Sequence, residues 1–210
     1  MNTSALSALA RRTQEPPISW LMATALARPN LISLAAGFTD NASLPLGETR
    51  ASINDLLSSP KAGQPALQYG STAGDPQLRK LTAAHLQHLD LGRQSAIRLR
   101  GYSPDRILIT NGSQQLLYMT SEALCDRGDI VLVENPTYFV FLGIIQSHGL
   151  QARGVRMEPD GVDLAHLESV LASLKRSGDL PRLKMLYLVT YFQNPTGITT
   201  SHAKKAAMLK

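Results

Sequence analysis

The second half of the chain alternates short runs of β-forming residues with segments whose leucines recur at helical spacing. This alternation limits the fold more than any other feature. Strands separated by helices lie parallel in one sheet, and the helices cover its faces. The pattern predicts an α/β fold with a mostly parallel sheet and helices on both faces. The expected strands are 106–110, 130–134, 151–156 and 184–190.

Helix start signals stand between these runs. Asp75 precedes Pro76, and this pair is typical of a helix that begins at the proline. Asp163 and Ser201 are likewise suited to cap the helices that follow them. Further helices are expected at 48–60, 114–126 and 137–148, with a glycine-rich loop over 61–75.

Composition argues against several classes of protein. The net charge is +5, but the lysines and arginines are scattered and are not interleaved with aromatic residues, so we expect no nucleic-acid partner. The longest apolar run, Tyr138 to Ile145, is too short to cross a bilayer, and the N-terminus lacks the apolar core of a signal peptide. The single Cys125 fits a structural thiol in a reducing compartment. We therefore expect a cytoplasmic protein without a membrane partner or a metal site.

The residues that follow the strands are the candidates for a binding site, because ligands of such sheets lie beyond the carboxyl ends of the strands. Asn-Gly-Ser-Gln-Gln follows the first strand at 111–115, Glu-Asn-Pro-Thr-Tyr ends the second at 134–138, and Gln-Asn-Pro-Thr-Gly follows the last at 193–197. A Gly-Ser turn at a helix start offers backbone N–H groups to a phosphate, although the same turn is more often a plain cap. Together the turns predict a site for a flat, phosphorylated ligand that forms hydrogen bonds.

Five motifs, in this order and at these separations, resemble the front part of the fold type I, pyridoxal phosphate dependent aminotransferases of class I/II. The turns around 113 and 193 look most like the branch that contains 2-aminoadipate and aromatic aminotransferases. The resemblance implies an N-terminal arm and small-domain segment at 1–50. It also implies that 51–210 form an incomplete large, cofactor-binding domain, truncated at its C-terminus. The motifs are ISLAAGF, LQYGSTAGDPQLR, ILITNGSQQ, VENPTY and YFQNPTG.

The resemblance also implies roles for residues of the three turns. Ser113 and Gln114 would hold the phosphate of pyridoxal phosphate, and Tyr138 would stack on its pyridine ring. Asn194 would donate a hydrogen bond to the phenolic oxygen of the ring and help to seat the substrate carboxylate. In the family the bond before the equivalent of Pro195 is commonly cis.

Two further positions resemble family contacts outside these turns. Gly37 would let a backbone N–H approach the substrate carboxylate, and Tyr69 would reach the cofactor phosphate of a partner subunit. The second contact implies a homodimer of the complete protein. Trp20 stands where aminoadipate enzymes of this branch carry an arginine, which argues against an acidic side chain on the substrate.

The implied activity is the transfer of an amino group from an amino acid to a 2-oxo acid. In the family, the Schiff-base lysine and the carboxylate on the pyridine nitrogen lie past Asn-Pro-Thr-Gly, beyond the end of this chain. We therefore assign no catalytic residue within it and expect the chain alone to be inactive. Lys204, Lys205 and Lys210 are expected on a solvated helix face.

Three alternatives remain open at this point. The chain could be the non-catalytic effector domain of a transcription regulator, which predicts a winged-helix domain upstream. A plain nucleotide-binding α/β domain is a second reading, for which the glycine-rich fingerprint is missing. A β-lyase or decarboxylase on the same fold is the third, because the residues that discriminate it are largely absent.

Overall fold

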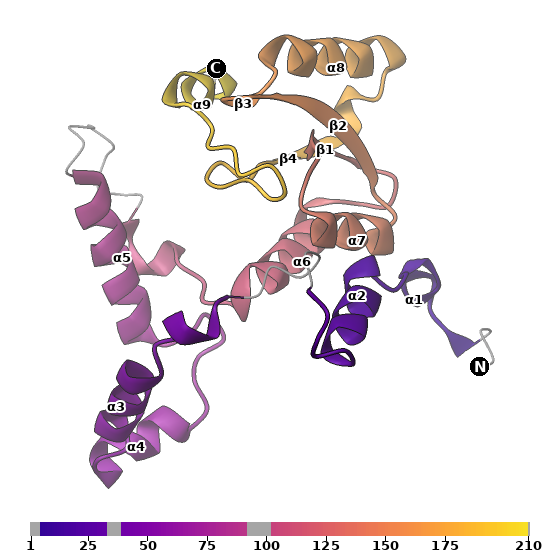
Figure 1. The fold of residues 1–210 in the computed structure, drawn as a ribbon. Coiled ribbons are helices and arrows are strands. Elements are labelled where there is room, and N and C mark those ends of the chain that lie inside the picture. The colour runs from indigo at the N-terminus through magenta and orange to yellow at the C-terminus, as the bar shows by residue number, and fades with distance from the viewer. Residues whose placement is uncertain (1–4, 33–38, 92–101, 210) are drawn as a thin grey trace. The chain divides into compact units, whose positions relative to one another are not determined.

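The computed structural model of the chain describes residues 5–32, 39–91 and 102–209. These residues belong to two compact units (Figure 1). One unit combines 1–30 with 112–210, and the other comprises 31–111. The division predicted at residue 50 concerns the domains of a complete enzyme and stays a prediction.

The first unit contains a sheet in which the described residues form four strands, in the order β3-β2-β1-β4. β1 is parallel to β2 on one side and to β4 on the other, and only β3 is antiparallel to its neighbour. The prediction of a mostly parallel sheet is confirmed. The strands are β1 (Ile130–Asn135), β2 (Gln151–Glu158), β3 (Gly161–Val162) and β4 (Leu183–Tyr187).

Helices cover both faces of this sheet, as the sequence predicts (Figure 1). Alternate residues of β1 point to opposite sides, so Ile130 and Leu132 join one apolar cluster while Val131 and Val133 join the other. The first cluster includes leucines of α8, and the second includes Phe141 and the isoleucines of α7. The helices are α6 (Gly112–Leu124), α7 (Phe139–His148), α8 (Leu164–Ser177) and α9 (His202–Met208).

The N-terminal helices α1 (Ala8–Arg12) and α2 (Pro17–Leu26) belong to the same unit. Arg12 ties α1 to the end of α7, because its Nε donates a hydrogen bond to the carbonyl oxygen of Ser147 at 3.1 Å. The predicted caps of α8 and α9 are confirmed: Asp163 accepts from the backbone N–H of His166, and Ser201 accepts from that of Lys204.

The second unit is helical, with α3 (Leu46–Leu56), α4 (Pro60–Leu67) and α5 (Pro76–Leu91). The predicted cap of α5 is confirmed, because Asp75 Oδ1 accepts from Leu78 N–H at 2.7 Å. The prediction of a helix that ends at Pro60 and a loop after it was wrong. Ser59 caps a new helix there, and Pro60 fits its first position because that residue needs no N–H donor.

The strand predicted at 106–110 was also wrong. Pro104–Arg106 form a 3-10 turn, and 107–110 pair with no strand in the part of the chain that the structure describes. Ile109 donates its N–H to the carbonyl oxygen of Ala73 at 3.0 Å. A β-strand needs a neighbouring strand, and β-forming side chains alone do not supply one.

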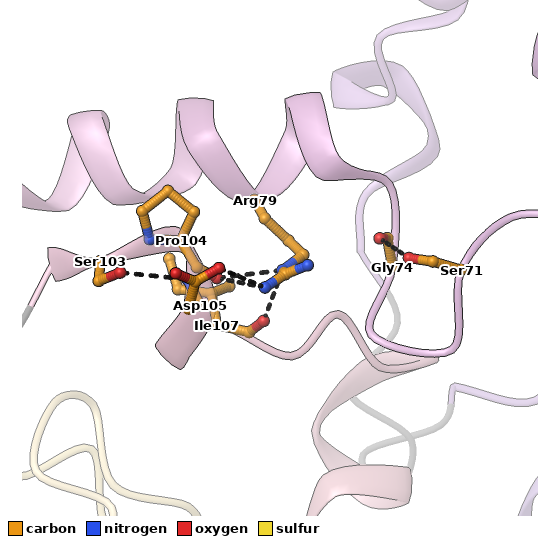
Figure 2. A network of polar contacts seen from close by, with 7 residues as sticks. All are labelled: Ser71, Gly74, Arg79, Ser103, Pro104, Asp105 and Ile107. Atoms are coloured by element: carbon orange, nitrogen blue, oxygen red, sulfur yellow. Dashed lines mark hydrogen bonds and ion pairs between the residues drawn. The ribbon is translucent and has the colours of Figure 1, made fainter.

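Arg79 of α5 holds this segment through its backbone carbonyls (Figure 2). Its Nε donates to Ile107 O at 2.9 Å, and its Nη2 donates to Pro104 O at 2.7 Å. Asp105 adds a looser ion pair at 3.7 Å. Because the segment lacks a β ladder, this guanidinium and the contact with Ala73 fix its path.

We predict that Gly74→Ala destabilises the second unit by about 1 to 3 kcal/mol, because the new methyl group would overlap a neighbour whose position the backbone sets. Gly74 has φ +97°, and an added Cβ would lie 2.5 Å from Ile109 Cβ. Urea unfolding followed by helical circular dichroism measures the loss. Gly70→Ala is the control, because nothing lies within 4 Å of its Cβ position. Equal unfolding midpoints for the two variants would contradict the prediction.

Candidate functional site

The carboxyl ends of β1 and β4 lie side by side, because the two strands pair in parallel. The turn at 134–138 therefore meets the loop at 188–197. Tyr138 stands just before α7 and is half-buried, with its ring centroid 5.6 Å from that of Phe139. Asn194 is exposed, and its side-chain amide has no hydrogen-bond partner among the described residues.

Each of the two turns contains a cis peptide bond. The bond between Asn194 and Pro195 is cis, as the family resemblance implies, and the bond between Asn135 and Pro136 is cis as well. The sequence analysis did not anticipate the second one. The proline turns that follow β1 and β4 therefore share one backbone feature at the same edge of the sheet.

A buried amide joins the two turns. Gln193 Nε2 donates to Glu134 Oε2 at 3.2 Å and to Pro136 O at 2.8 Å. Gln193 Oε1 accepts from the backbone N–H of Thr196 at 3.0 Å and from its hydroxyl at 2.6 Å. Glu134 stands at the end of β1 and Gln193 in the loop after β4, and the sequence patterns predicted no role for either residue.

Glu134 is a buried carboxyl group at the end of a buried strand. It is 1% exposed, and its Oε2 also accepts from Val189 N–H at 3.1 Å. Burial raises the pKa of Glu134 above its usual 4.5, and the hydrogen bonds from Val189 and Gln193 offset only part of this rise. Its Oε1 is buried without a hydrogen-bond partner in the described part of the chain.

The N-terminus of α6 carries the predicted phosphate-binding residues. Ser113 and Gln114 are exposed, and the first turn of the helix contains no acidic side chain that would repel an anion. Gly112 has φ +77°, which favours glycine, and open space surrounds its Cβ position. No hydrogen bond among the described residues links Ser113 or Gln114 to Tyr138 or Asn194.

Neither of the other two predicted residues belongs to the described part of the first unit. Tyr69 lies in the second unit and is 99% exposed, and its backbone N–H donates to Gln68 Oε1. Gly37 lies outside the described residues. The structure thus joins the turns of Tyr138 and Asn194, and it leaves the roles of all six predicted residues as predictions.

The expectation of a solvated face for all three lysines was wrong for Lys204. Lys204 is buried, and its Nζ forms ion pairs with Glu158 and with Asp160, the latter at 2.8 Å. Burial is the largest single influence and lowers the pKa of Lys204, but the hydrogen bonds to the two carboxylates and their negative charges together outweigh it and raise the pKa above 10.5. Lys205 Nζ lies 3.6 Å from the ring centroid of Tyr191. Lys210 is outside the described residues.

Among the described residues, no group of three or more His, Cys, Asp or Glu side chains could hold a metal ion, and no helix has the length and apolar character needed to cross a membrane.

Several known proteins are similar to this chain. The family model of Aminotransferase class I and II matches residues 29–210. The 2-aminoadipate transaminase of Thermus thermophilus is 33% identical over 179 residues, which cover 85% of this chain and 39% of that protein. The crystal structure of Pyrococcus horikoshii kynurenine aminotransferase in complex with PMP superposes with a TM-score of 0.82 at 29% identity, covering 98% of this chain and 48% of that one.

A regulator is similar as well. The HTH-type transcriptional regulator YisV of Bacillus subtilis is 31% identical over 144 residues, which cover 69% of this chain and 26% of the regulator. The chain thus spans less than half the length of each of these three proteins. Its mostly parallel sheet between two helical layers is the front part of the pyridoxal phosphate fold type I. The chain belongs to the class I and II aminotransferases, a family whose cofactor is pyridoxal phosphate.

Proposed function

We propose that the protein transfers an amino group from an amino acid to a 2-oxo acid with pyridoxal phosphate as its cofactor. Membership of the family supports aminotransferase chemistry. The observation that carries the proposal is the junction of two strand-end turns, one with Tyr138 and the other with Asn194, at a single edge of the sheet. Substrate and partner assignments follow from the family resemblance.

Groups of the two turns and of the start of α6 suit the parts of pyridoxal phosphate. The start of α6, with the Ser113 hydroxyl and the Gln114 side chain, suits the phosphate because its first turn offers N–H groups and no competing acid. The amide of Asn194 has no other hydrogen-bond partner among the described residues and can donate to the phenolic oxygen. The half-buried ring of Tyr138 suits a stacking contact with the pyridine ring.

Bound pyridoxal phosphate supplies an electron sink for the α-carbon of the amino acid. The residues of this chain bind and orient. Ser113 and Gln114 anchor the phosphate, Tyr138 limits the tilt of the ring, and Asn194 keeps the phenolic oxygen in place. Asn194 and the backbone of Gly37 also bind the substrate carboxylate in this proposal.

We assign no proton transfer to the lysines of α9. A lysine that joins the cofactor must lose its proton, whereas Lys204 is held in the charged form by Glu158 and Asp160. Lys205 is engaged with the ring of Tyr191. The proposal therefore assigns the base to neither of these lysines and includes the inactivity of this chain on its own.

The proposal extends to the assembly and to the substrate. Tyr69 is fully exposed, which suits a residue that binds the cofactor phosphate of a second copy in a homodimer. Trp20 is 65% exposed, and no arginine stands at this position for an acidic substrate side chain. We further propose a cytoplasmic protein with no nucleic-acid partner, whose complete form divides near residue 50 into a small and a large domain.

The likeness to YisV favours one second candidate, the effector domain of a transcription regulator. The same strand-end turns would hold pyridoxal phosphate in either candidate, so binding alone does not separate them. The two candidates are separated by transamination assays of the intact protein with a panel of amino donors and 2-oxoglutarate. An intact protein that binds the cofactor without any turnover would favour the regulator.

We predict that Tyr138→Leu weakens binding of pyridoxal phosphate up to about tenfold and shifts its visible absorbance, because stacking contributes about 0.5 to 1.5 kcal/mol beyond buried area. The measurement is a titration of the intact protein followed by absorbance, with circular dichroism to show that the fold is kept. Phe139→Leu is the matched control, because it changes an exposed aromatic side chain at the same helix start. Equal affinities for the Tyr138→Leu variant and the unmodified protein would remove the stacking role.

We predict that the 210-residue chain shows no transamination above the free-cofactor background and that no lysine becomes covalently linked to pyridoxal phosphate. The chain is incubated with the cofactor and reduced with borohydride, and peptides are mapped by mass spectrometry. Lys204→Met serves as a control for weak, non-specific labelling at this helix. Stoichiometric labelling of one lysine together with turnover would overturn the proposal for this chain.

A further inference from the structure

We propose that Glu134 and Gln193 are positioning residues, whose buried hydrogen-bonded bridge sets the place of the Tyr138 turn relative to the Asn194 turn. The inference rests on the proposed function for its catalytic meaning. All residues of this bridge belong to the first unit. We refer to the contact between the two side chains as the Glu134–Gln193 bridge.

The bridge is continuous from one turn to the other. Glu134 is fixed from the β4 side by two donors, the backbone N–H of Val189 at 3.1 Å and the side chain of Gln193 at 3.2 Å. Gln193 is fixed from the β1 side as well, because it also donates to Pro136 O at 2.8 Å. One amide group therefore contacts the backbone and the side chain of the opposite turn at once.

The same amide closes the loop that carries Asn194. Its Oε1 accepts two hydrogen bonds from Thr196, on the far side of the cis bond that follows Asn194. Asn194 thus lies in the short segment between Gln193 and Thr196, which the side chain of Gln193 closes. On the other turn, the carbonyl oxygen of Pro136 that Gln193 contacts lies two residues before Tyr138. The bridge touches both turns next to the proposed ligand groups without using those groups.

Burial strengthens the hydrogen bonds of the Glu134–Gln193 bridge. Glu134 and Gln193 are each 1% exposed, so water does not compete for their hydrogen bonds. Removing one partner leaves the donors or acceptors of the other unpaired in the interior, which costs more than the loss of an exposed hydrogen bond. An apolar residue at either position could fill the space, but it could not hold the two turns in register.

The first experiment tests the bridge without the cofactor. Backbone amide exchange of Val189 and Thr196 is measured by NMR in the unmodified chain and in Glu134→Leu, Glu134→Gln and Thr199→Ala. We expect exchange of both amides to be about tenfold faster in Glu134→Leu, because Val189 loses its acceptor and Gln193 loses one anchor. Glu134→Gln keeps an acceptor oxygen and should retain slow exchange.

Thr199→Ala is the matched control within the same loop. Its hydroxyl accepts from Phe192 N–H at 3.3 Å but does not contact the bridge. It should leave the exchange of Val189 and Thr196 within about twofold of the unmodified chain, since the acceptors of both amides are unchanged. Amide exchange that is unaltered in Glu134→Leu, or that is as fast in Glu134→Gln as in Glu134→Leu, would show that the Glu134–Gln193 bridge does not hold the two turns.

The second experiment tests the positioning of Asn194 in the intact protein. Asn194→Ala should weaken binding of pyridoxal phosphate by about tenfold or more, because a hydrogen bond to a charged oxygen is lost. In the Glu134→Leu background the same substitution should cost no more than about twofold, since Asn194 is already misplaced. The full cost should return in the Glu134→Gln background. Additive costs would show that Glu134 acts on stability alone and would overturn the inference.

The two experiments separate this inference from the proposed function. If the unmodified intact protein binds no pyridoxal phosphate, the proposed function fails, and the amide exchange still decides whether the bridge holds the two turns. If the cofactor binds but the exchange and coupling results are negative, the inference fails while the proposed function stands.

The pH dependence of stability gives an independent readout. Because burial raises the pKa of Glu134 in the folded chain, the folded state binds this proton more tightly than the unfolded state. Its contribution to stability is therefore complete below pH 4.5 and declines as the pH rises through the folded-state pKa. Tyr187 and Tyr138 are the titratable groups that interact with this region, and burial raises the pKa of Tyr187 further above that range. Glu134→Gln should abolish this decline in urea unfolding, and a decline of the same size in the variant would contradict the assignment.

Discussion

The burial of β1 on both faces is the constraint on which the rest of the first unit depends. Ile130 to Val133 are at most 4% exposed, and successive side chains enter opposite apolar clusters. A strand that is buried in this way must have strands on both sides and helices above and below. Parallel pairing with β2 and β4 meets this demand, and it directs the chain out of β1 and β4 at the same edge.

The position of the candidate site follows from this geometry, and it requires the burial of a carboxyl group. Where β1 ends, its last buried residue is the carboxyl group of Glu134 rather than another apolar side chain. A charge at that place is unfavourable unless hydrogen bonds accompany it. The donors come from the neighbouring turn, so the group that would destabilise an isolated strand end instead couples the β1 turn to the β4 turn. Stability and site geometry are linked through this one side chain.

Local patterns predicted the parts of the fold that local chemistry decides. Alternating strands and helices gave the sheet type and the two helical layers, and Asp75, Asp163 and Ser201 were recognised as caps because a cap depends on the next three residues. The segment at 107–110 was misread because its residues favour a strand but the strand also needs a partner. Pro60 was misread because a proline can end one helix or begin another, and only the Ser59 contact decides.

The parts of the site that the sequence did not reveal depend on residues far apart in the chain. Glu134 and Gln193 are separated by 59 positions, and the residues next to them in the sequence do not indicate that the two side chains are in contact. The burial of Lys204 also depends on distant residues. The composition of α9 is that of a solvated helix, but Glu158 and Asp160 at the end of β2 form ion pairs with Lys204. In each case a polar side chain can be buried because a distant residue forms a hydrogen bond or an ion pair with it. Local sequence patterns do not identify that distant residue. Family motifs mark groups that contact a ligand, so residues that hold those groups in place must be found from hydrogen bonds and burial.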